Sequence, residues 1–426
     1  MQARPSSRGV LSAVLSALLF ASMPAAAQSL GEALKGFLHD DAVATLHLRS
    51  YFLDRTNPQP PNAAAWAGGG WVGYESGRLY DALRVGAVGY TSQPLWAPPG
   101  TDGTLLLKPG RYGFFVLGQA YASLKVGEQL LTGYRQIVDE LEVNPNDDRM
   151  VPNTFEAYAL RGSVADVDYF AGYVAAMKPR DYSTFINMAE RAGAPNASAG
   201  MGLVGLKYGS IDSLRLRGGA YHVPDILTSS YGDAVWMVPL SGPVRVRLNG
   251  NVMVQGSNGQ NLLTGTSFST WSGGTRADMI WGPGTVWTAY TQTGSAAFWR
   301  NSYGVWLGFT KQITKDFDRA NEKAFQIGAG FDFAGIALPG LTFLASGTFG
   351  SGALNPATGA YLPQNTEYDL DLIYQVAGKS APDWLKPLQL RARAAYVETN
   401  TTGSLSSTTE YRLVMNYEMK FRGKDY

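Results

Sequence analysis

Apolar and polar side chains alternate with a period of two along much of the chain, most clearly in residues 409–421. Side chains of a β-strand point alternately to the two sides of the sheet, so this pattern predicts a strand with one apolar and one polar face. Residues 244–255, 367–374 and 388–396 alternate in the same way, which predicts an all-β fold. In the last strand the apolar face holds Tyr411, Leu413, Met415, Tyr417, Met419 and Phe421, and the polar face holds Glu410, Arg412, Val414, Asn416, Glu418 and Lys420.

The charges on these strands favour a membrane barrel over a water-soluble sandwich, although strands of both kinds alternate. The polar faces carry charges at successive positions, whereas the apolar faces carry aromatic residues near their ends. In a barrel in lipid the apolar face points outward, the polar face lines the lumen, and aromatic side chains form girdles at the two interfaces. Closure of the sheet leaves no unpaired edge in the bilayer. We therefore predict a transmembrane antiparallel β-barrel.

The connections between the expected strands alternate in length, which predicts short periplasmic turns and long extracellular loops. Eight short and nine long connections would join about 18 strands. The short ones fall near residues 76–79, 120–121, 163–167, 209–213, 241–243, 282–284, 335–340 and 376–386. The long ones fall near residues 53–63, 92–110, 131–155, 179–200, 223–234, 256–270, 295–323, 350–364 and 398–408.

Residues 1–27 have the features of a secretory signal peptide. Basic Arg4 and Arg8 precede an apolar run at 10–20, and the alanines at 25–27 offer a cleavage site. A membrane anchor is the alternative, but the apolar run is shorter than the roughly 20 residues that a spanning helix needs. We expect residues 28–426 to form a single barrel domain without a plug domain, since strand-like sequence starts near Val43. Residues 30–41 are either a short periplasmic lead-in or a disordered start.

Composition excludes several classes of protein and site. The chain has 35 Lys and Arg residues and 34 Asp and Glu residues, which gives a net charge of +1. It therefore lacks the strong positive charge that is typical of proteins that bind nucleic acids. The absence of cysteine excludes disulfides, thiol nucleophiles and cysteine-ligated metals. Because the chain has only three histidines, a metal site with several histidine ligands is nearly excluded as well. We expect no metal and no cofactor. Charged residues make up 16%, below the roughly 25% of soluble domains, whereas Trp 10, Tyr 23 and Phe 18 suit lipid-facing girdles.

Six segments follow one another along the chain in a specific order: Leu48–Phe52, Trp66–Gly77, Leu124–Glu128, Asn146–Glu156, Ala324–Phe333 and Leu390–Arg393. Together these segments resemble the OprD-type outer-membrane porins. The resemblance covers essentially the whole chain after residue 27. It implies an 18-stranded barrel in a Gram-negative outer membrane, narrowed by inward-folded loops and lined by basic residues that guide carboxylate-bearing solutes. One departure is that five residues follow Phe421, which leaves open whether Phe421 or Tyr426 serves the barrel assembly machinery.

Arginines on the polar faces form a candidate basic ladder along the pore. A charge beside low-dielectric walls focuses the field, and an arginine can hold a carboxylate with two parallel hydrogen bonds while a series of sites lets it move on. The alternative is that these arginines brace the wall by pairing with lumen acids. The ladder comprises Arg49, Arg215, Arg217, Arg245, Arg247, Arg391, Arg393 and Arg412, and the acids available for bracing include Asp369, Asp371, Glu410 and Glu418.

The third long connection, near 131–155, is the constriction loop implied by the resemblance. We assign Asp147, Asp148 and Arg149 to it, with Asp139, Glu140 and Glu142 as further charges. An acidic loop that faces a basic wall would set a transverse field and orient a solute carrying an amine and a carboxylate. The alternative is a solvated external loop. The connection near 295–323 is a second candidate for folding inward.

These features predict a passive, substrate-biased channel for small hydrophilic solutes such as amino acids, aromatic acids and other organic acids. We expect no catalytic residues. Two rivals stay open: a barrel-embedded hydrolase using His47 or His222, and a structural or adhesive barrel with a plugged lumen. The expected partners are the solutes, outer-membrane lipid and the barrel assembly machinery, with no nucleic acid. The chain would be a monomer or a loose homotrimer.

Overall fold

The computed structural model describes residues 29–336, 338–377, 381–401 and 403–425. The proposed signal peptide and Tyr426 lie outside these residues. The strands are β1 (Val43–Thr56), β2 (Ala63–Glu75), β3 (Leu83–Trp96), β4 (Phe114–Val126), β5 (Gln129–Gln136), β6 (Thr154–Val164), β7 (Val167–Lys178), β8 (Ile186–Asn187), β9 (Met201–Gly209), β10 (Leu214–Val223), β11 (Leu227–Val238), β12 (Val244–Gly256), β13 (Ser269–Trp281), β14 (Gly284–Thr293), β15 (Lys323–Asp332), β16 (Leu341–Ser351), β17 (Gln364–Gln375), β18 (Leu388–Thr401) and β19 (Ser404–Arg422).

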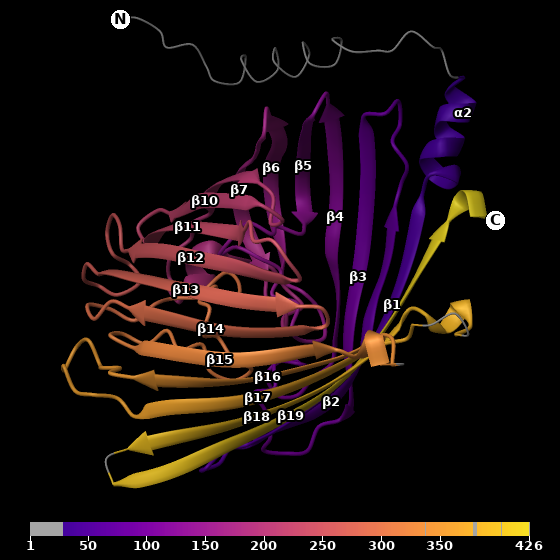
Figure 1. The fold of residues 1–426 in the computed structure, drawn as a ribbon. Coiled ribbons are helices and arrows are strands. Elements are labelled where there is room, and N and C mark those ends of the chain that lie inside the picture. The colour runs from indigo at the N-terminus through magenta and orange to yellow at the C-terminus, as the bar shows by residue number, and fades with distance from the viewer. Residues whose placement is uncertain (1–28, 337, 378–380, 402, 426) are drawn as a thin grey trace, which may run out of the picture.

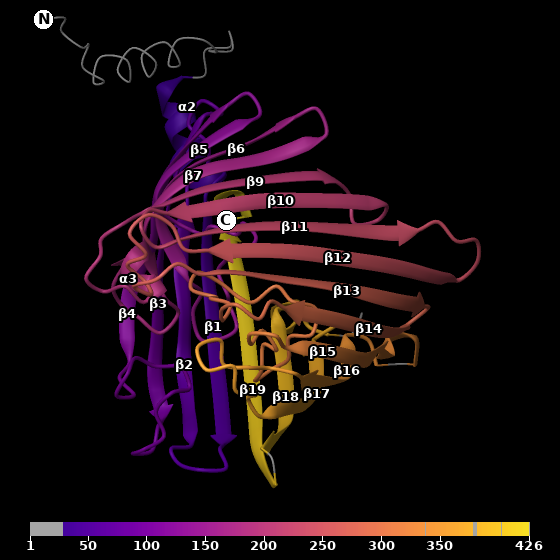
Figure 2. The same ribbon diagram turned by 90° about the vertical axis from the view of Figure 1, so that its left-hand side faces the viewer.

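The strands form one closed antiparallel barrel (Figures 1 and 2). Each long strand pairs with its neighbour in the chain, and β1 pairs with β19 from Val43↔Arg422 to Thr56↔Thr409, which closes the sheet. The two-residue β8 pairs only with β7, while β7 also pairs with β9. The ring therefore has 18 strands and β8 is an addition to it, which confirms the predicted fold class.

Alternation along each strand separates an outer apolar surface from the lumen, as predicted. On β19, Tyr411 and Leu413 are exposed, whereas Glu410 and Arg412 are buried. No helix among the described residues is long and apolar enough to cross a membrane.

The predicted connections differ from the observed ones at three places. The turn expected at 120–121 lies within β4, and the chain reverses instead at residues 127–128, where Gly127 adopts a φ of +57°. The alternation of small and polar residues near 120 resembles a turn, but each of these residues tolerates an extended backbone.

The other two differences are predicted long loops that belong to strands. Only residues 224–226 separate β10 from β11, and only 402–403 separate β18 from β19. Both stretches are rich in Ser and Thr. Threonine is β-branched and favours strands, so polar composition alone did not mark a loop here.

Much of the buried apolar side-chain volume lies inside the barrel, where loops pack against the inner wall. One cluster joins Val138 and Val143 of loop 137–153 to Phe155, Phe170 and Tyr221 on the wall. Short helices complete the fold: α2 (Leu30–Lys35), the π-helix η1 (Gly36–Asp40), α3 (Met188–Ala192), and the 3-10 turns η2 (Phe333–Ile336), η3 (Asp383–Leu385) and η4 (Gly423–Asp425).

Candidate solute passage

The inner wall carries sets of one carboxylate flanked by two arginines, which we call triads. Asp371 on β17 contacts two arginines of β18, through Arg391 Nε at 2.8 Å and Arg393 Nε at 3.1 Å. Asp233 on β11 lies against Arg217, with Nε–Oδ2 at 3.0 Å, and against Arg215, with Nη2–Oδ1 at 3.6 Å. Two of the three predicted pairs of arginines thus share one acid from the neighbouring strand.

Two further triads include arginines that the sequence did not single out. Asp278 on β13 contacts Arg247 Nε at 3.1 Å and Arg276 Nη2 at 2.7 Å. Glu410 on β19 pairs with Arg412 of its own strand and with Arg55 of β1. Each triad carries one more positive than negative charge.

In three of the four wall triads the carboxylate is more hidden than both arginines, whereas in the fourth Arg412 is as buried as Glu410 and only Arg55 is partly exposed. The side chains of Asp278 and Glu410 are 0% exposed and that of Asp371 is 9% exposed, whereas those of Arg217 and Arg391 are 33% and 34% exposed. The acids thus fix the guanidinium groups from behind and leave part of their surface toward the lumen. Bracing and solute contact are therefore compatible on this wall.

The other predicted ladder residues occupy different surroundings. Arg245 is exposed, and the described residues give it no ion pair. Arg412 is fully buried and donates from Nη2 to the Ile313 carbonyl at 2.8 Å. Arg49 is also buried, where it binds Asn416 and loop 137–153.

Loop 137–153 crosses the interior of the barrel. At one end Glu142 accepts a hydrogen bond of 2.7 Å from Ser229 on β11. At the other, Arg49 Nη1 on β1 donates to Asp147 Oδ1 at 2.6 Å, and Tyr51 donates to the Asp148 carbonyl at 3.2 Å. Because β1 and β11 are nine strands apart in both directions around the ring, these contacts attach the loop to opposite walls.

A fifth triad lies within the loops. Asp148 Oδ2 accepts from Arg149 Nη1 at 2.8 Å, and Asp148 Oδ1 pairs with Arg180 of loop 179–200. Burial opposes ionisation of Asp148, but Arg149 and Arg180 outweigh it and hold its pKa below the ordinary value. Burial lowers the pKa of Arg149 to about 10, which still leaves it charged at neutral pH.

Glu142 is partly buried, and no cation pairs with it among the contacts that the structure describes. Burial raises its pKa to about 7, and the hydrogen bond from Ser229 offsets this only in part. One side of the loop is therefore held to the wall by the ion pair of Asp147 with Arg49. The other side is held through the carboxyl group of Glu142, which is half protonated near neutral pH.

Loop 294–322 also folds into the lumen, where acids of β17 hold its backbone. Asp369 accepts from Ile313 N, and Glu367 accepts from Thr314 N and Lys315 N, each at 2.7 Å. Three consecutive amide groups thus point at two buried carboxylates. In the same loop, burial together with the neighbouring Asp316 and Glu322 raises the pKa of Asp318 to about 7.

The two inward loops contact each other at Asn144. Its Oδ1 accepts from Val305 N at 3.0 Å, and its backbone N donates to the Tyr303 carbonyl at 3.4 Å. A side chain at Gly304 would collide here, since a Cβ atom would lie 2.5 Å from the Glu142 carbonyl oxygen. The loops therefore form one joined body across the lumen.

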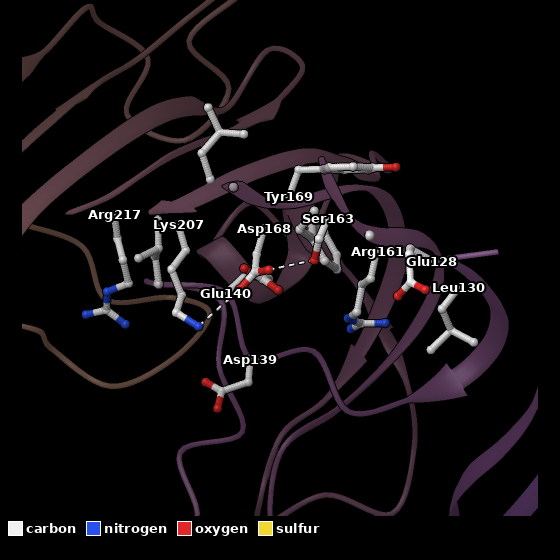
Figure 3. A pocket seen from close by; sticks show the side chains of 15 residues that line it. Glu128, Leu130, Asp139, Glu140, Arg161, Ser163, Asp168, Tyr169, Lys207 and Arg217 are labelled. Atoms are coloured by element: carbon white, nitrogen blue, oxygen red, sulfur yellow. Dashed lines mark hydrogen bonds and ion pairs between the residues drawn. The ribbon is translucent and has the colours of Figure 1, made fainter. Parts of the chain in front are cut away.

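A cavity of about 430 Å³ lies between the first part of loop 137–153 and strands β5, β6, β7, β9 and β10. Figure 3 shows acids and bases of several elements converging on it, with Asp139 and Glu140 from the loop and Arg161 and Arg217 from the wall. Nearby, Asp168 binds Ser163 at 2.6 Å and Lys207 at 3.1 Å. Burial raises the pKa of Glu140.

Most cavity residues were absent from the sequence-predicted site. Arg161, Lys207 and Asp168 lie on inward positions of β6, β9 and β7, so strand parity offered a signal for them. Their meeting with Glu140, however, depends on the path of the loop, which parity does not encode.

The two histidines considered for a hydrolase, His47 and His222, both have polar partners in the structure. His47 stacks on Trp71 with ring centroids 3.7 Å apart and contacts Glu418 and Asn416, each at 3.2 Å. His222 contacts the hydroxyl of Thr228 at 2.8 Å. Within the part of the chain that the structure describes, no cluster of three His, Cys, Asp or Glu residues could hold a metal.

Comparisons agree on the class of protein that this barrel represents. The structure resembles OpdK from Pseudomonas aeruginosa, solved with vanillate, at a TM-score of 0.76 and 21% identity over 91% of this chain and 100% of that one. It resembles OccK9 (OpdG) of the same species at a TM-score of 0.79 and 22% identity, over 89% of this chain and 99% of that one. It also resembles OccAB1 of Acinetobacter baumannii at a TM-score of 0.79 and 19% identity, over 91% of this chain and 98% of that one. Among curated proteins no sequence matches.

The fold is thus that of an outer-membrane porin. Residues 35–421 match the model described as outer membrane porin, OprD family, and the chain belongs to this family. It is accordingly a channel of the substrate-specific porin class, embedded in the Gram-negative outer membrane and passing small solutes.

Proposed function

We propose that this porin passes small hydrophilic solutes that bear a carboxylate, by passive diffusion. The observation that carries the proposal is the set of triads, each with a surplus positive charge and at least one partly exposed arginine. Arginine recognises carboxylates through a planar fork, and a charge beside a low-dielectric wall raises the local concentration of counter-ions. Several weak sites in series bind the solute and still release it.

Loops 137–153 and 294–322 are, in this proposal, the constriction. They are joined at Asn144 and fixed to the wall at Arg49 and Glu367, so they narrow the lumen while resisting displacement. The cavity beside loop 137–153 has Asp139 and Glu140 on the loop and Arg161 and Arg217 on the wall, where Asp168 is already paired with Lys207. A solute with an amine and a carboxylate would lie with its amine toward Glu140 and its carboxylate toward Arg161 or Arg217.

The test uses purified, folded protein in planar bilayers and in liposomes. We expect stepwise conductance, a reversal potential in a salt gradient that favours anions, and faster swelling with carboxylates than with neutral sugars of equal size. The solutes should include vanillate, an amino acid and a dicarboxylate. Equal rates for charged and neutral solutes would refute the carboxylate preference, and a folded barrel without conductance would favour a plugged, structural barrel. Ester hydrolysis that is lost on replacing His47 would favour the hydrolase.

The cavity has a separate test. Glu140→Gln should slow the uptake of a zwitterionic amino acid several-fold more than that of a monocarboxylate of similar size, because only the zwitterion uses the acidic side. Arg161→Gln should slow both solutes. If Glu140→Gln affected the two solutes equally, the cavity would not orient the solute.

We further propose that residues 1–27 are removed as a signal peptide and that residues 28–426 are inserted by the barrel assembly machinery as one domain. N-terminal sequencing of outer-membrane material should begin at Gln28. Mass measurement by light scattering in detergent would distinguish a monomer from a loose homotrimer.

A further inference from the structure

A short helical segment, residues 29–41, stands at the barrel rim that carries the short turns (Figures 1 and 2). Helix α2 begins with a capping box, in which Ser29 and Glu32 each bind the backbone of the other, and continues into η1. The sequence did not predict this helix, because it is too short to show a clear period.

One face of the segment is apolar and uncovered. Leu30, Leu34 and Leu38 follow one another at intervals of four, which places them along one side of a helix. They are 61%, 39% and 58% exposed. The charged side chains of Glu32 and Lys35 lie off this stripe, so the segment is amphipathic.

The segment is fixed to the outer, lipid-facing side of the rim. Tyr74, whose side chain points outward from β2, donates its hydroxyl to the Leu38 carbonyl at 2.8 Å. The amide of Gly77 donates to the Phe37 carbonyl at 2.8 Å. The Leu38 end of the stripe therefore lies beside the outward apolar row of β2, which includes Tyr74 and the exposed Val72.

A second rim segment repeats this arrangement. Tyr417, outward on β19, donates its hydroxyl to the Trp384 carbonyl in η3, and the Trp384 side chain is 68% exposed. At two places, then, a girdle tyrosine binds a rim segment that presents a large apolar side chain. At the membrane–water interface, a tyrosine hydroxyl without a protein partner binds water or a lipid headgroup.

We propose that residues 29–41 are an interfacial anchor that lies on the phospholipid surface, with Leu34 and Leu38 in the headgroup–acyl boundary and residues 381–387 as a second contact. An amphipathic helix at an interface buries its apolar face while its charged side chains stay in water. The stripe joins a surface already covered by lipid, and this continuity favours lipid over a second copy or a soluble partner.

The absence of cysteine in the chain permits single-cysteine labelling of the full-length barrel in bilayers. Leu34→Cys, Lys35→Cys and Val72→Cys would each carry an environment-sensitive fluorophore, with Val72 as the lipid-facing reference. Quenching would be measured with acyl-chain doxyl phosphatidylcholine and with aqueous iodide. Heat-modifiable mobility on gels would verify that each variant is folded.

We expect doxyl lipid to quench the label at position 34 at least twofold more than the label at position 35, with the opposite order for iodide. Tyr74→Phe in the Leu34→Cys background should reduce the lipid quenching, because it frees the segment from the rim. Equal iodide quenching at positions 34 and 35 would overturn the proposal. A position-34 label shielded from both quenchers would overturn it too, since protein would then cover the stripe.

Discussion

Arg49 and Asp147, which lie 98 positions apart in the chain, form a two-point ion pair inside the barrel. Nη1–Oδ1 is 2.6 Å and Nη2–Oδ2 is 3.2 Å. Arg49 Nη1 also donates to the Arg149 carbonyl at 2.6 Å. The first strand thus holds both a side chain and the backbone of loop 137–153, and the pair fixes one end of the loop to the wall.

Asp147→Asn should loosen this end of the loop. A hydrogen bond to a charged group contributes roughly 1–3 kcal/mol, and Arg49 is left buried without its counter-charge. We expect larger single-channel conductance and more frequent current transitions, measured in planar bilayers.

The matched control for this variant is Asp166→Asn, which makes the same charge change in the exposed turn at 165–166. If Asp147→Asn and Asp166→Asn gave identical conductance and transition rates, the pair would not hold the loop.

The sequence predicted the barrel but not the internal contacts that shape its lumen. The side of the barrel that a strand residue faces depends on local alternation. The sequence pattern therefore predicted that Arg391, Arg393 and Asp371 face the lumen, and they lie on that side of β17 and β18. The pairing of Asp147 with Arg49 depends on the path of a 17-residue loop through the interior, and no local period encodes that path. Sequence reasoning also treated bracing and solute contact as alternatives, whereas arginines of the wall triads pair with acids and still keep part of their surface exposed.

The Arg391–Asp371–Arg393 triad should set part of the ion selectivity. Replacing both arginines by glutamine leaves Asp371 unpaired and changes the formal charge of the triad from +1 to −1. The reversal potential in a salt gradient should shift toward cation preference, and carboxylate uptake should fall several-fold.

Arg391→Lys with Arg393→Lys keeps the charge but removes the planar fork, so it separates the two effects. We expect it to preserve ion selectivity and to slow carboxylate uptake. A reversal potential unchanged in the double glutamine variant would mean that this triad serves the wall alone.

Conductance should depend on pH around 7, because both inward loops contain a partly buried carboxyl group whose pKa is raised to about 7. The pKa of Glu142 and of Asp318 is higher in the folded than in the unfolded state. The folded state therefore binds more protons, its stability is full below about pH 4, and it declines as pH rises through about 7. For each group the loss amounts to roughly 3–4 kcal/mol.

We therefore expect the loops to loosen between pH 6 and pH 8, with more current transitions at the higher pH. Glu142→Gln with Asp318→Asn should flatten this profile, because neither replacement ionises, while Asp166→Asn should leave it intact. Single-channel records across the range would provide the measurement, and a profile that the double variant does not change would assign the pH dependence to other groups.

Glu367 should act as a clamp on loop 294–322. Its two carboxylate oxygens accept from Thr314 N and Lys315 N, and its side chain is fully buried. In Glu367→Gln one acceptor becomes a donor that faces an amide N–H, so one bond is lost at a cost of roughly 1–3 kcal/mol. Glu398→Gln on the adjacent β18 makes the same charge change away from the loop and is the control.

The clamp should couple to loop 137–153, since Asn144 joins the two loops. Asn144→Ala alone should raise the transition rate of the channel, and combined with Glu367→Gln its effect should depart from additivity by more than about 0.5 kcal/mol, as expected for residues in one network. The rates of the four variants of this cycle, converted to free energies, give the coupling. Strict additivity would show that the two loops move independently, and the constriction would then consist of two separate barriers.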